Sequence, residues 1–146
     1  THKDYKKIRN LKILGEVDSR DFYFMRDSMD ALQALNLKEV RIKGYGYVET
    51  GTGKHLDDQI PGSAFYRNSQ MGGNQTLTHL ILPDKLKSIG ANAFYGCKYL
   101  TGSLKIPEGV EEIQRGAFNS CTSLNGTLSL PSILTHLGTS RSGTKR

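Results

Sequence analysis

The sequence predicts a short α/β repeat solenoid, a right-handed stack of similar coils with a helix-and-strand cap at its N-terminal end. The main observation is a fixed period, because the segment 80–83 (LILP) recurs at 104–107 (LKIP) and again at 128–131 (LSLP). A second motif, AFxxC, starts at Ala93 and returns at Ala117, with the same step of 24 residues. A constant step of this size indicates one supersecondary unit per repeat. Stacked units present a surface, so we expect a binding or scaffolding protein.

Residues 1–59 are expected to form the N-terminal cap and an irregular loop. A short strand at 11–14 is predicted to end at Gly15. A helix is predicted over about 20–31, because Asp18 is a good N-cap residue. Its apolar face has helical spacing and comprises Phe22, Met25, Met29 and Leu32. The L-x-x-L-x-L run at 32–37 then predicts a strand with its leucines turned into the coil.

The repeats are assigned to 60–138, after a glycine-broken loop at 44–59. A degenerate first unit begins at Ile60, and its Ala64 lies 29 residues before Ala93. The excess over 24 is placed at 71–74 (MGGN), as a surface insertion. Each short Ala-Phe segment is expected to form a single helical turn. The last eight residues, 139–146, are expected to be a disordered basic tail, because they lack a hydrophobic wedge.

Composition and charge exclude several classes of protein. The 146 residues have a formal net charge of +6, 36% hydrophobic residues and no Trp. The excess positive charge lies mainly in the first dozen residues and the last six, while the repeats mix both signs, so we expect no nucleic-acid partner. No stretch is apolar and long enough to span a bilayer. The chain begins at Thr1, so we interpret it as a processed form whose export signal lies outside it.

The positions predicted to point outward from the strands form the candidate binding face. Residues between inward-facing leucines turn to solvent, although an ordinary solvated sheet accounts for the same pattern equally well. The face comprises Asn36, Thr78, His79, Ile81, Ser103, Lys105, Thr127 and Ser129. Tyr45 and Tyr47 are candidate loop contacts, because exposed aromatic residues on loops often anchor partners.

The sequence offers no catalytic, cofactor or metal site. It has no nucleophile elbow and no H-E-x-x-H motif, and its four histidines are scattered. The run GTGK at 51–54 departs from a phosphate-binding loop because His55 follows the lysine. Cys97 and Cys121 occupy equivalent positions on successive coils. We expect buried free thiols there; a disulfide is the alternative if their Cα atoms come within about 7 Å.

The repeat unit resembles the BspA-like class of leucine-rich repeats of Bacteroides-type bacteria. The specific segments are 94–100 (FYGCKYL) and 118–124 (FNSCTSL), within a resemblance that covers 60–138. The resemblance implies a secreted or cell-surface protein. It also implies adhesion to host matrix proteins such as fibronectin and fibrinogen, and it carries no catalytic residues over to this chain.

Two functions follow from the sequence. The first is a non-enzymatic bacterial surface or secreted protein that binds host or bacterial proteins, or glycans, through its repeat face. The second is a structural spacer or assembly module. In that alternative an uncapped C-terminal coil recruits another copy, because the array ends at 137–138 without a polar cap.

Overall fold

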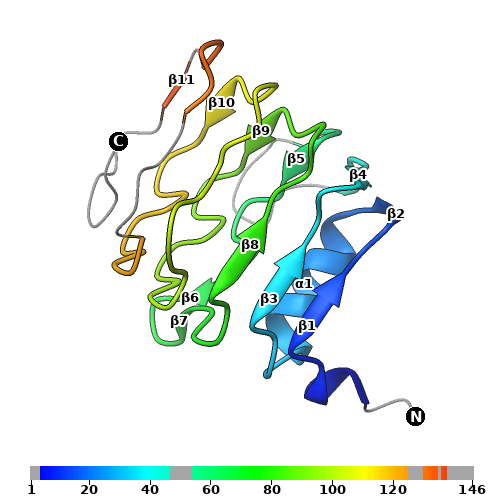
Figure 1. Ribbon diagram of the computed structural model, residues 1–146, viewed down its shortest axis with the longest axis vertical. Helices are drawn as coiled ribbons and strands as arrows, with labels where there is room; N and C mark the ends of the chain where they lie inside the picture. Colours follow the sequence, from blue (N-terminus) through cyan, green and yellow to red (C-terminus); the bar gives the residue numbers. More distant parts are fainter. Residues whose placement is uncertain (1–3, 47–53, 125–129, 135, 138–146) are drawn as a thin grey trace.

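The chain folds as a stack of coils with parallel strands on its walls, in a computed structural model that describes residues 4–46, 54–124, 130–134 and 136–137 (Figure 1). The predicted repeat solenoid is therefore confirmed. The first wall consists of β1 (Asn10–Lys12), β3 (Ala34–Asn36) and β8 (His79–Ile81). The second wall consists of β5 (Gln59–Ile60), β9 (Ser88–Ile89), β10 (Glu112–Ile113) and β11 (His136–Leu137). We call the first of these the strand wall.

Strand register confirms the repeat period. Ile89 pairs with Ile113, which is the predicted step of 24 residues. Ile60 pairs with Ile89, which is the longer step predicted for the degenerate first unit. Pro83 follows β8, where its missing amide hydrogen suits the end of a strand ladder. The predicted basic tail at 139–146 lies outside the described residues.

The N-terminal cap contains a single turn of 3₁₀ helix, Asp4–Lys7, and the helix α1, Ser19–Ser28. Asp18 is the N-cap as predicted: its side chain accepts a hydrogen bond from the Arg20 backbone, and Asp21 completes a capping box. The helix ends three residues before the predicted position, because Met29 leaves the helical conformation (φ −101°, ψ 75°). The predicted apolar face is buried.

The strand predicted at 11–14 is present as β1, but it ends at Lys12, two residues before the predicted end. Gly15 is the first residue of a further strand, β2 (Gly15–Val17). Its φ is +89°, a conformation that favours glycine. β2 pairs in parallel with β4 (Val40–Ile42). The run at 32–37 is extended as predicted, with Leu32, Leu35 and Leu37 buried around β3.

The Ala-Phe segments are tight turns, and the prediction of a helical turn is wrong. Cys97 N donates to Phe94 O at 3.1 Å, an i to i+3 bond. Asn92 and Gly96 have φ of 56° and 71°, which no right-handed helix accommodates. The motif recurs because it joins coils: Phe65 N donates to Ala93 O (2.7 Å), as Phe94 N does to Ala117 O (2.8 Å).

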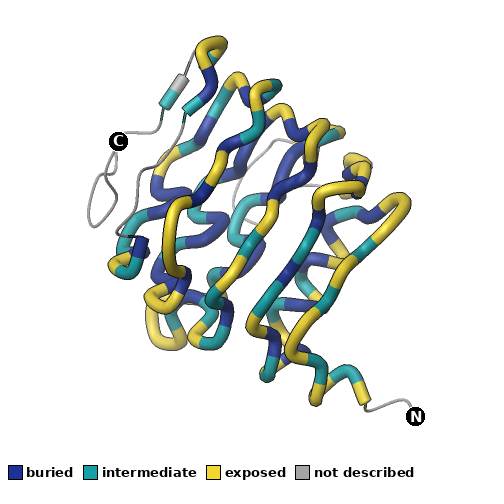
Figure 2. The backbone as a smooth tube through the Cα atoms, in the orientation of Figure 1, coloured by how far each residue is buried: buried dark blue, intermediate teal, exposed yellow. Residues whose placement is uncertain are grey.

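The core is a column of aromatic rings running along the stack. The rings of Phe94 and Phe65 are stacked with centroids 5.5 Å apart, and those of Phe94 and Phe118 with centroids 5.3 Å apart. Phe22 of α1 meets Phe65 edge to face at 6.3 Å, so the helix begins the same column. Figure 2 shows the buried residues lining the inside of the coils. Each coil therefore contributes one phenylalanine to a continuous core.

The predicted insertion is a small hairpin. β6 (Tyr66–Asn68) and β7 (Gly72–Gly73) pair antiparallel, and Met71 between them is 61% exposed. Gly73 is buried, and the position requires glycine because a Cβ there would clash with Tyr95 O on the next coil. The insertion is therefore a surface feature at its tip and a packing contact at its base.

Candidate functional site

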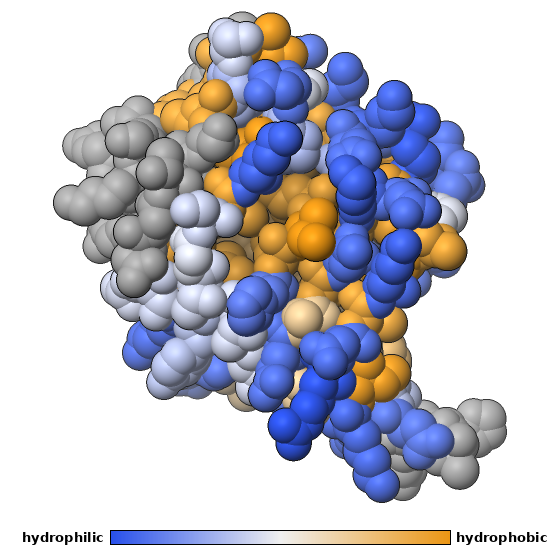
Figure 3. Space-filling model, in the orientation of Figure 1, coloured by the Kyte–Doolittle hydropathy of each residue, from blue (hydrophilic) through white to orange (hydrophobic). Residues whose placement is uncertain are grey.

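The strand wall brings several of the predicted face residues together. Asn36 pairs in register with Ile81, and His79 stands two residues before Ile81 on β8. Ile81, the last residue of β8, is 49% exposed. Figure 3 shows hydrophobic residues gathered in a hollow in the middle of this wall, flanked by hydrophilic side chains.

An apolar depression of about 340 Å³ crosses all the strands of this wall. Its lining residues come from β1, β3 and β8, and they include Leu11, Leu35, Asn36, His79 and Ile81. Short side chains such as Ala34 leave room between the larger ones. The arrangement is an apolar centre with a few polar groups at its edge, as in the middle of many protein interfaces.

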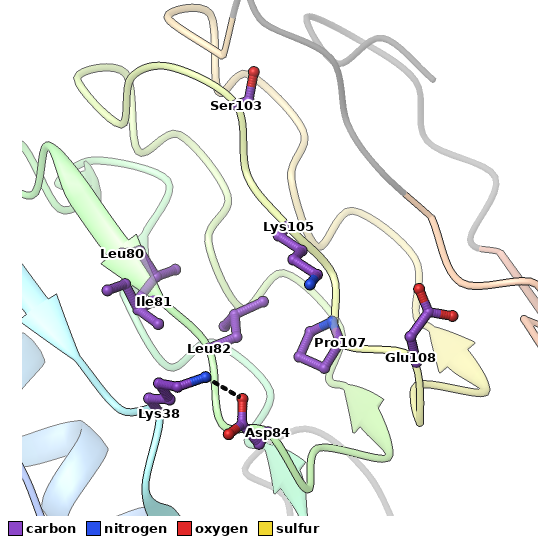
Figure 4. Close-up of a pocket in the computed structure, with 9 residues that line it drawn as sticks. All are labelled: Lys38, Leu80, Ile81, Leu82, Asp84, Ser103, Lys105, Pro107 and Glu108. Atoms are coloured by element: carbon purple, nitrogen blue, oxygen red, sulfur yellow. Dashed lines mark hydrogen bonds and ion pairs between the residues drawn. The ribbon is translucent and has the colours of Figure 1, made fainter.

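A second depression, of about 430 Å³, lies between β8 and the next coil (Figure 4). β8 contributes Leu80 and Ile81 to one side, and Ser103 and Lys105 stand on the other. The predicted face residues Ser103 and Lys105 are therefore near Ile81, but they do not belong to the same sheet, which ends at β8. We call this depression the slit.

Charged groups surround both depressions. Lys12 pairs with Glu39 at 3.1 Å, and Lys38 pairs with Asp84 at 3.0 Å on the β8 side of the slit, where it joins the coil of β3 to the coil of β8 (Figure 4). All these side chains are more than half exposed, so each pair contributes little to stability. Lys105 is exposed and forms no ion pair with any described residue. It is a free positive charge beside an apolar surface.

The remaining predicted residues lie apart from this centre or outside the described residues. The Thr78 hydroxyl donates to Gln33 O at 3.1 Å, so this side chain ties two coils together. Tyr45 is 48% exposed, and the Arg20 guanidinium lies 3.7 Å from its ring centroid, at the start of α1. Tyr47, Thr127 and Ser129 are not among the described residues.

Cys97 and Cys121 are free and buried. Burial raises the pKa of both thiols, that of Cys121 to about 12. The neutral thiol is the form present at physiological pH, and it is a poor nucleophile and a poor metal ligand. These residues behave as small core side chains.

Within the described part of the chain, no group of three or more His, Cys, Asp and Glu side chains could hold a metal ion. No described helix is long and apolar enough to cross a bilayer. The most perturbed carboxyl groups are Asp18 and Asp27, whose pKa values are lowered mainly by hydrogen bonds from Arg20 and Arg26 respectively. Both belong to ion pairs around α1, away from the depressions.

Sequence analysis missed the slit. The available signal was a change in spacing: Leu77 and Leu80 are three residues apart, whereas Leu100 and Leu104 are four residues apart. Gly102 is the extra residue, and its φ is +77°. The change was visible in the sequence, but its effect on strand pairing was not.

Comparison with known proteins identifies the repeat. A family model described as the BspA type leucine-rich repeat region (6 copies) matches residues 58–141. A solved leucine-rich repeat protein from Bacteroides ovatus is similar, with 28% identity and a TM-score of 0.57 over 90% of this chain. The chain spans only 33% of that protein. No curated protein matches. Since the family model matches more than half of the sequence, the chain belongs to the BspA-type leucine-rich repeat family.

Proposed function

We propose that this chain is a non-enzymatic, protein-binding repeat module, and that the strand wall is its binding surface. Leucine-rich repeats are protein-binding scaffolds and are typically non-enzymatic. The observation that carries the proposal is the half-exposed Ile81, which lines both the apolar depression and the slit. Exposed apolar patches with polar rims are features of protein interaction sites.

The composition of the surface favours a protein partner over a small molecule. The apolar depression is shallow and lies open along three short strands, whereas small-ligand pockets enclose most of their ligand. Its rim offers His79 and Asn36, which supply hydrogen-bonding groups, and Lys12, which is paired with Glu39. A partner would bury Ile81 and contact the polar groups around it. Interfaces often have this arrangement, in which a buried residue that dominates the binding energy is surrounded by weaker contacts.

BspA-type leucine-rich repeat proteins are typically secreted or located at the cell surface. We propose the same location for this chain, with an adhesin-like role toward host or bacterial surface proteins. The family resemblance makes fibronectin and fibrinogen the first partners to test. The absence of a disulfide between Cys97 and Cys121 is compatible with this location, because both thiols are buried and protected from oxidation.

The test is binding of the purified chain to immobilised fibronectin and fibrinogen, measured for the wild type and two matched variants. Ile81→Asp places a charge in the lining shared by both depressions, whereas Tyr99→Asp alters a residue of similar exposure (53%) outside both depressions. We expect Ile81→Asp to weaken binding by about tenfold or more, as for an interface centre, and Tyr99→Asp to leave it unchanged. Equal effects of the two variants, or no binding by the wild type, would contradict the proposal.

Self-association through the last described coil is a second candidate. Leu134 and Leu137 are only partly buried, whereas their equivalents one coil earlier, Val110 and Ile113, are buried. Ile133 beside them is 47% exposed. Light scattering across a concentration series tests this candidate: it predicts a mass that rises with concentration and that Leu137→Lys returns to the monomer. A constant monomer mass would exclude it.

A further inference from the structure

The strand wall is split between β8 and the following coil. The sheet ends at β8, and no hydrogen bond joins β8 to residues 103–107 within the described residues. The coils do meet on either side of this gap. Thr101 N donates to Thr78 O at 3.0 Å before it, and Glu111 N donates to Lys87 O at 2.9 Å after it. The slit is therefore a local opening with two closed ends.

The opening has a cause in the sequence. In the coil of β8, Leu80 stands three positions after Leu77, and β8 follows β3 in register. In the next coil Gly102 adds a residue between Leu100 and Leu104, and its positive φ turns the chain. A Cβ built on Gly102 meets nothing within 4 Å, so this bend lies at an open place. An added residue of this kind disrupts a strand ladder locally, as in a β-bulge.

Backbone groups of Leu80 face the slit. His79 N donates to Gln33 O (3.0 Å) and Leu37 N donates to Ile81 O (2.9 Å), so His79 and Ile81 use their backbone groups toward β3. Backbone groups of successive strand residues point to opposite sides, which directs the N–H and C=O of Leu80 away from β3. They form no hydrogen bond with another described residue.

The opposite side of the slit offers backbone N–H and C=O groups of the same kind. Ser103 and Lys105 are exposed like His79 and Ile81, and their chain runs in the same direction. In parallel strands, residues that face the same way direct their backbone groups to the same side. Ser103 and Lys105 therefore direct theirs toward β8. The slit has strand edges on both sides, and edges of this kind recruit another strand.

We propose that the slit binds an extended peptide segment of a partner protein, which carries an acidic residue opposite Lys105. This inference rests on the proposed function, that the strand wall binds protein. An extended backbone presents N–H and C=O groups alternately to both sides, so it satisfies Leu80 on one side and Ser103 on the other. The volume of about 430 Å³ accommodates a few residues. Lys38 is already paired with Asp84, so Lys105 is the available cation; the exposed Glu108 also lines the slit and lies beyond Pro107 (Figure 4).

The probe is a blocked peptide of about six residues, a usual strand length, with alternating threonine and valine and one central glutamate. Amide hydrogen exchange of Leu80 is followed by NMR with and without this peptide, using the full chain. We expect the peptide to slow exchange of the Leu80 amide by about tenfold or more. A control peptide with the same side chains but N-methylated throughout should not bind, because it cannot donate backbone hydrogen bonds.

Two variants of the protein sharpen the test. Lys105→Glu should reverse the preference, so that a peptide with central lysine binds better than the glutamate peptide. Deletion of Gly102 restores the spacing of the preceding coil, so it should let the two edges pair, protect the Leu80 amide without peptide and abolish peptide binding. Unchanged peptide binding by either variant would contradict the proposed slit contacts.

The outcomes separate this inference from the proposed function. If fibronectin or fibrinogen binds in an Ile81-dependent manner but neither glutamate nor lysine peptide binds, the strand wall is a binding surface and the slit inference is wrong. Binding of the N-methylated peptide, or peptide binding that leaves Leu80 exchange unchanged, also overturns it. If the glutamate peptide protects Leu80 while no folded protein binds, the slit inference stands and the folded-partner proposal fails.

Discussion

The Sγ of Cys121 lies 3.0 Å from the carbonyl oxygen of Phe94 on the preceding coil, and the thiol donates a hydrogen bond to it. Cys97 stands in the same relationship to Phe65, at a longer 3.8 Å. Both cysteines are buried, so water does not reach these carbonyls. The cysteine of the repeat therefore fills a small space and adds a second donor to a carbonyl that already accepts a backbone N–H, from Cys97 at Phe94 O and from Asn74 at Phe65 O.

Replacing Cys121 by alanine should lower the free energy of unfolding by about 1–2 kcal/mol, because the change leaves a small cavity and removes a donor from a buried carbonyl. Urea denaturation measures this effect. Lys98→Ala, at an exposed neighbouring position, is the control and should stay within about 0.5 kcal/mol of the wild type. A loss no larger for Cys121→Ala than for Lys98→Ala would mean that the thiol contact contributes nothing.

The two thiols should be unreactive toward a disulfide reagent at pH 8 in the folded protein, and both should react in denaturant. Burial raises their pKa, that of Cys121 from 9.0 to about 12.

A group with a raised folded-state pKa contributes stability that is present below its unfolded value and lost as pH rises through the folded value. Stability should therefore decline above about pH 9. Cys121→Ser, whose hydroxyl does not titrate there, should show a smaller decline.

Phe94 should be the most sensitive position of the aromatic column, because it stacks on Phe65 and on Phe118. Phe94→Ala should cost about 3–5 kcal/mol, measured by thermal or urea unfolding, with Tyr99→Ala as the exposed control. Phe94→Leu retains much of the volume and should cost less. If Phe94→Ala were no more destabilising than Tyr99→Ala, the column would not be the structural core.

Asp18 should stabilise the cap as an N-cap residue, and Asp18→Ala should cost about 1 kcal/mol at pH 7. The hydrogen bond from Arg20 lowers the pKa of Asp18 below 3.8. A lowered folded-state pKa means that the contribution is present above the unfolded value and lost as pH falls through the folded one. Asp18→Asn, which keeps the acceptor but not the charge, should therefore lose less stability between pH 4 and pH 2. An identical acid profile for wild type and Asp18→Asn would contradict this assignment.

Repetition made most of the fold predictable. Leucines and phenylalanines recurring at a constant step place equivalent side chains one above another, and Ile89 accordingly pairs with Ile113 in the next coil. The cap was predictable for a local reason, since Asp18 precedes an apolar face of helical spacing.

Deviations from the repeat were harder to predict. The alanines of the Ala-Phe segment favour a helix, but Asn92 and Gly96 adopt positive φ because their amides reach carbonyls of the next coil, at Arg115 and Asn119. This is tertiary hydrogen bonding, which local propensity does not contain. The slit likewise depends on how one extra residue, Gly102, is absorbed between neighbouring coils.

The most direct test of the strand wall as the binding surface is amide hydrogen exchange of the whole chain with and without bound fibronectin or fibrinogen. We predict new protection at β3 and β8, centred on Ile81, and at residues 103–107, with little change along α1. Protection confined to α1 or to the turns around Phe94, with the strand wall unchanged, would contradict the account.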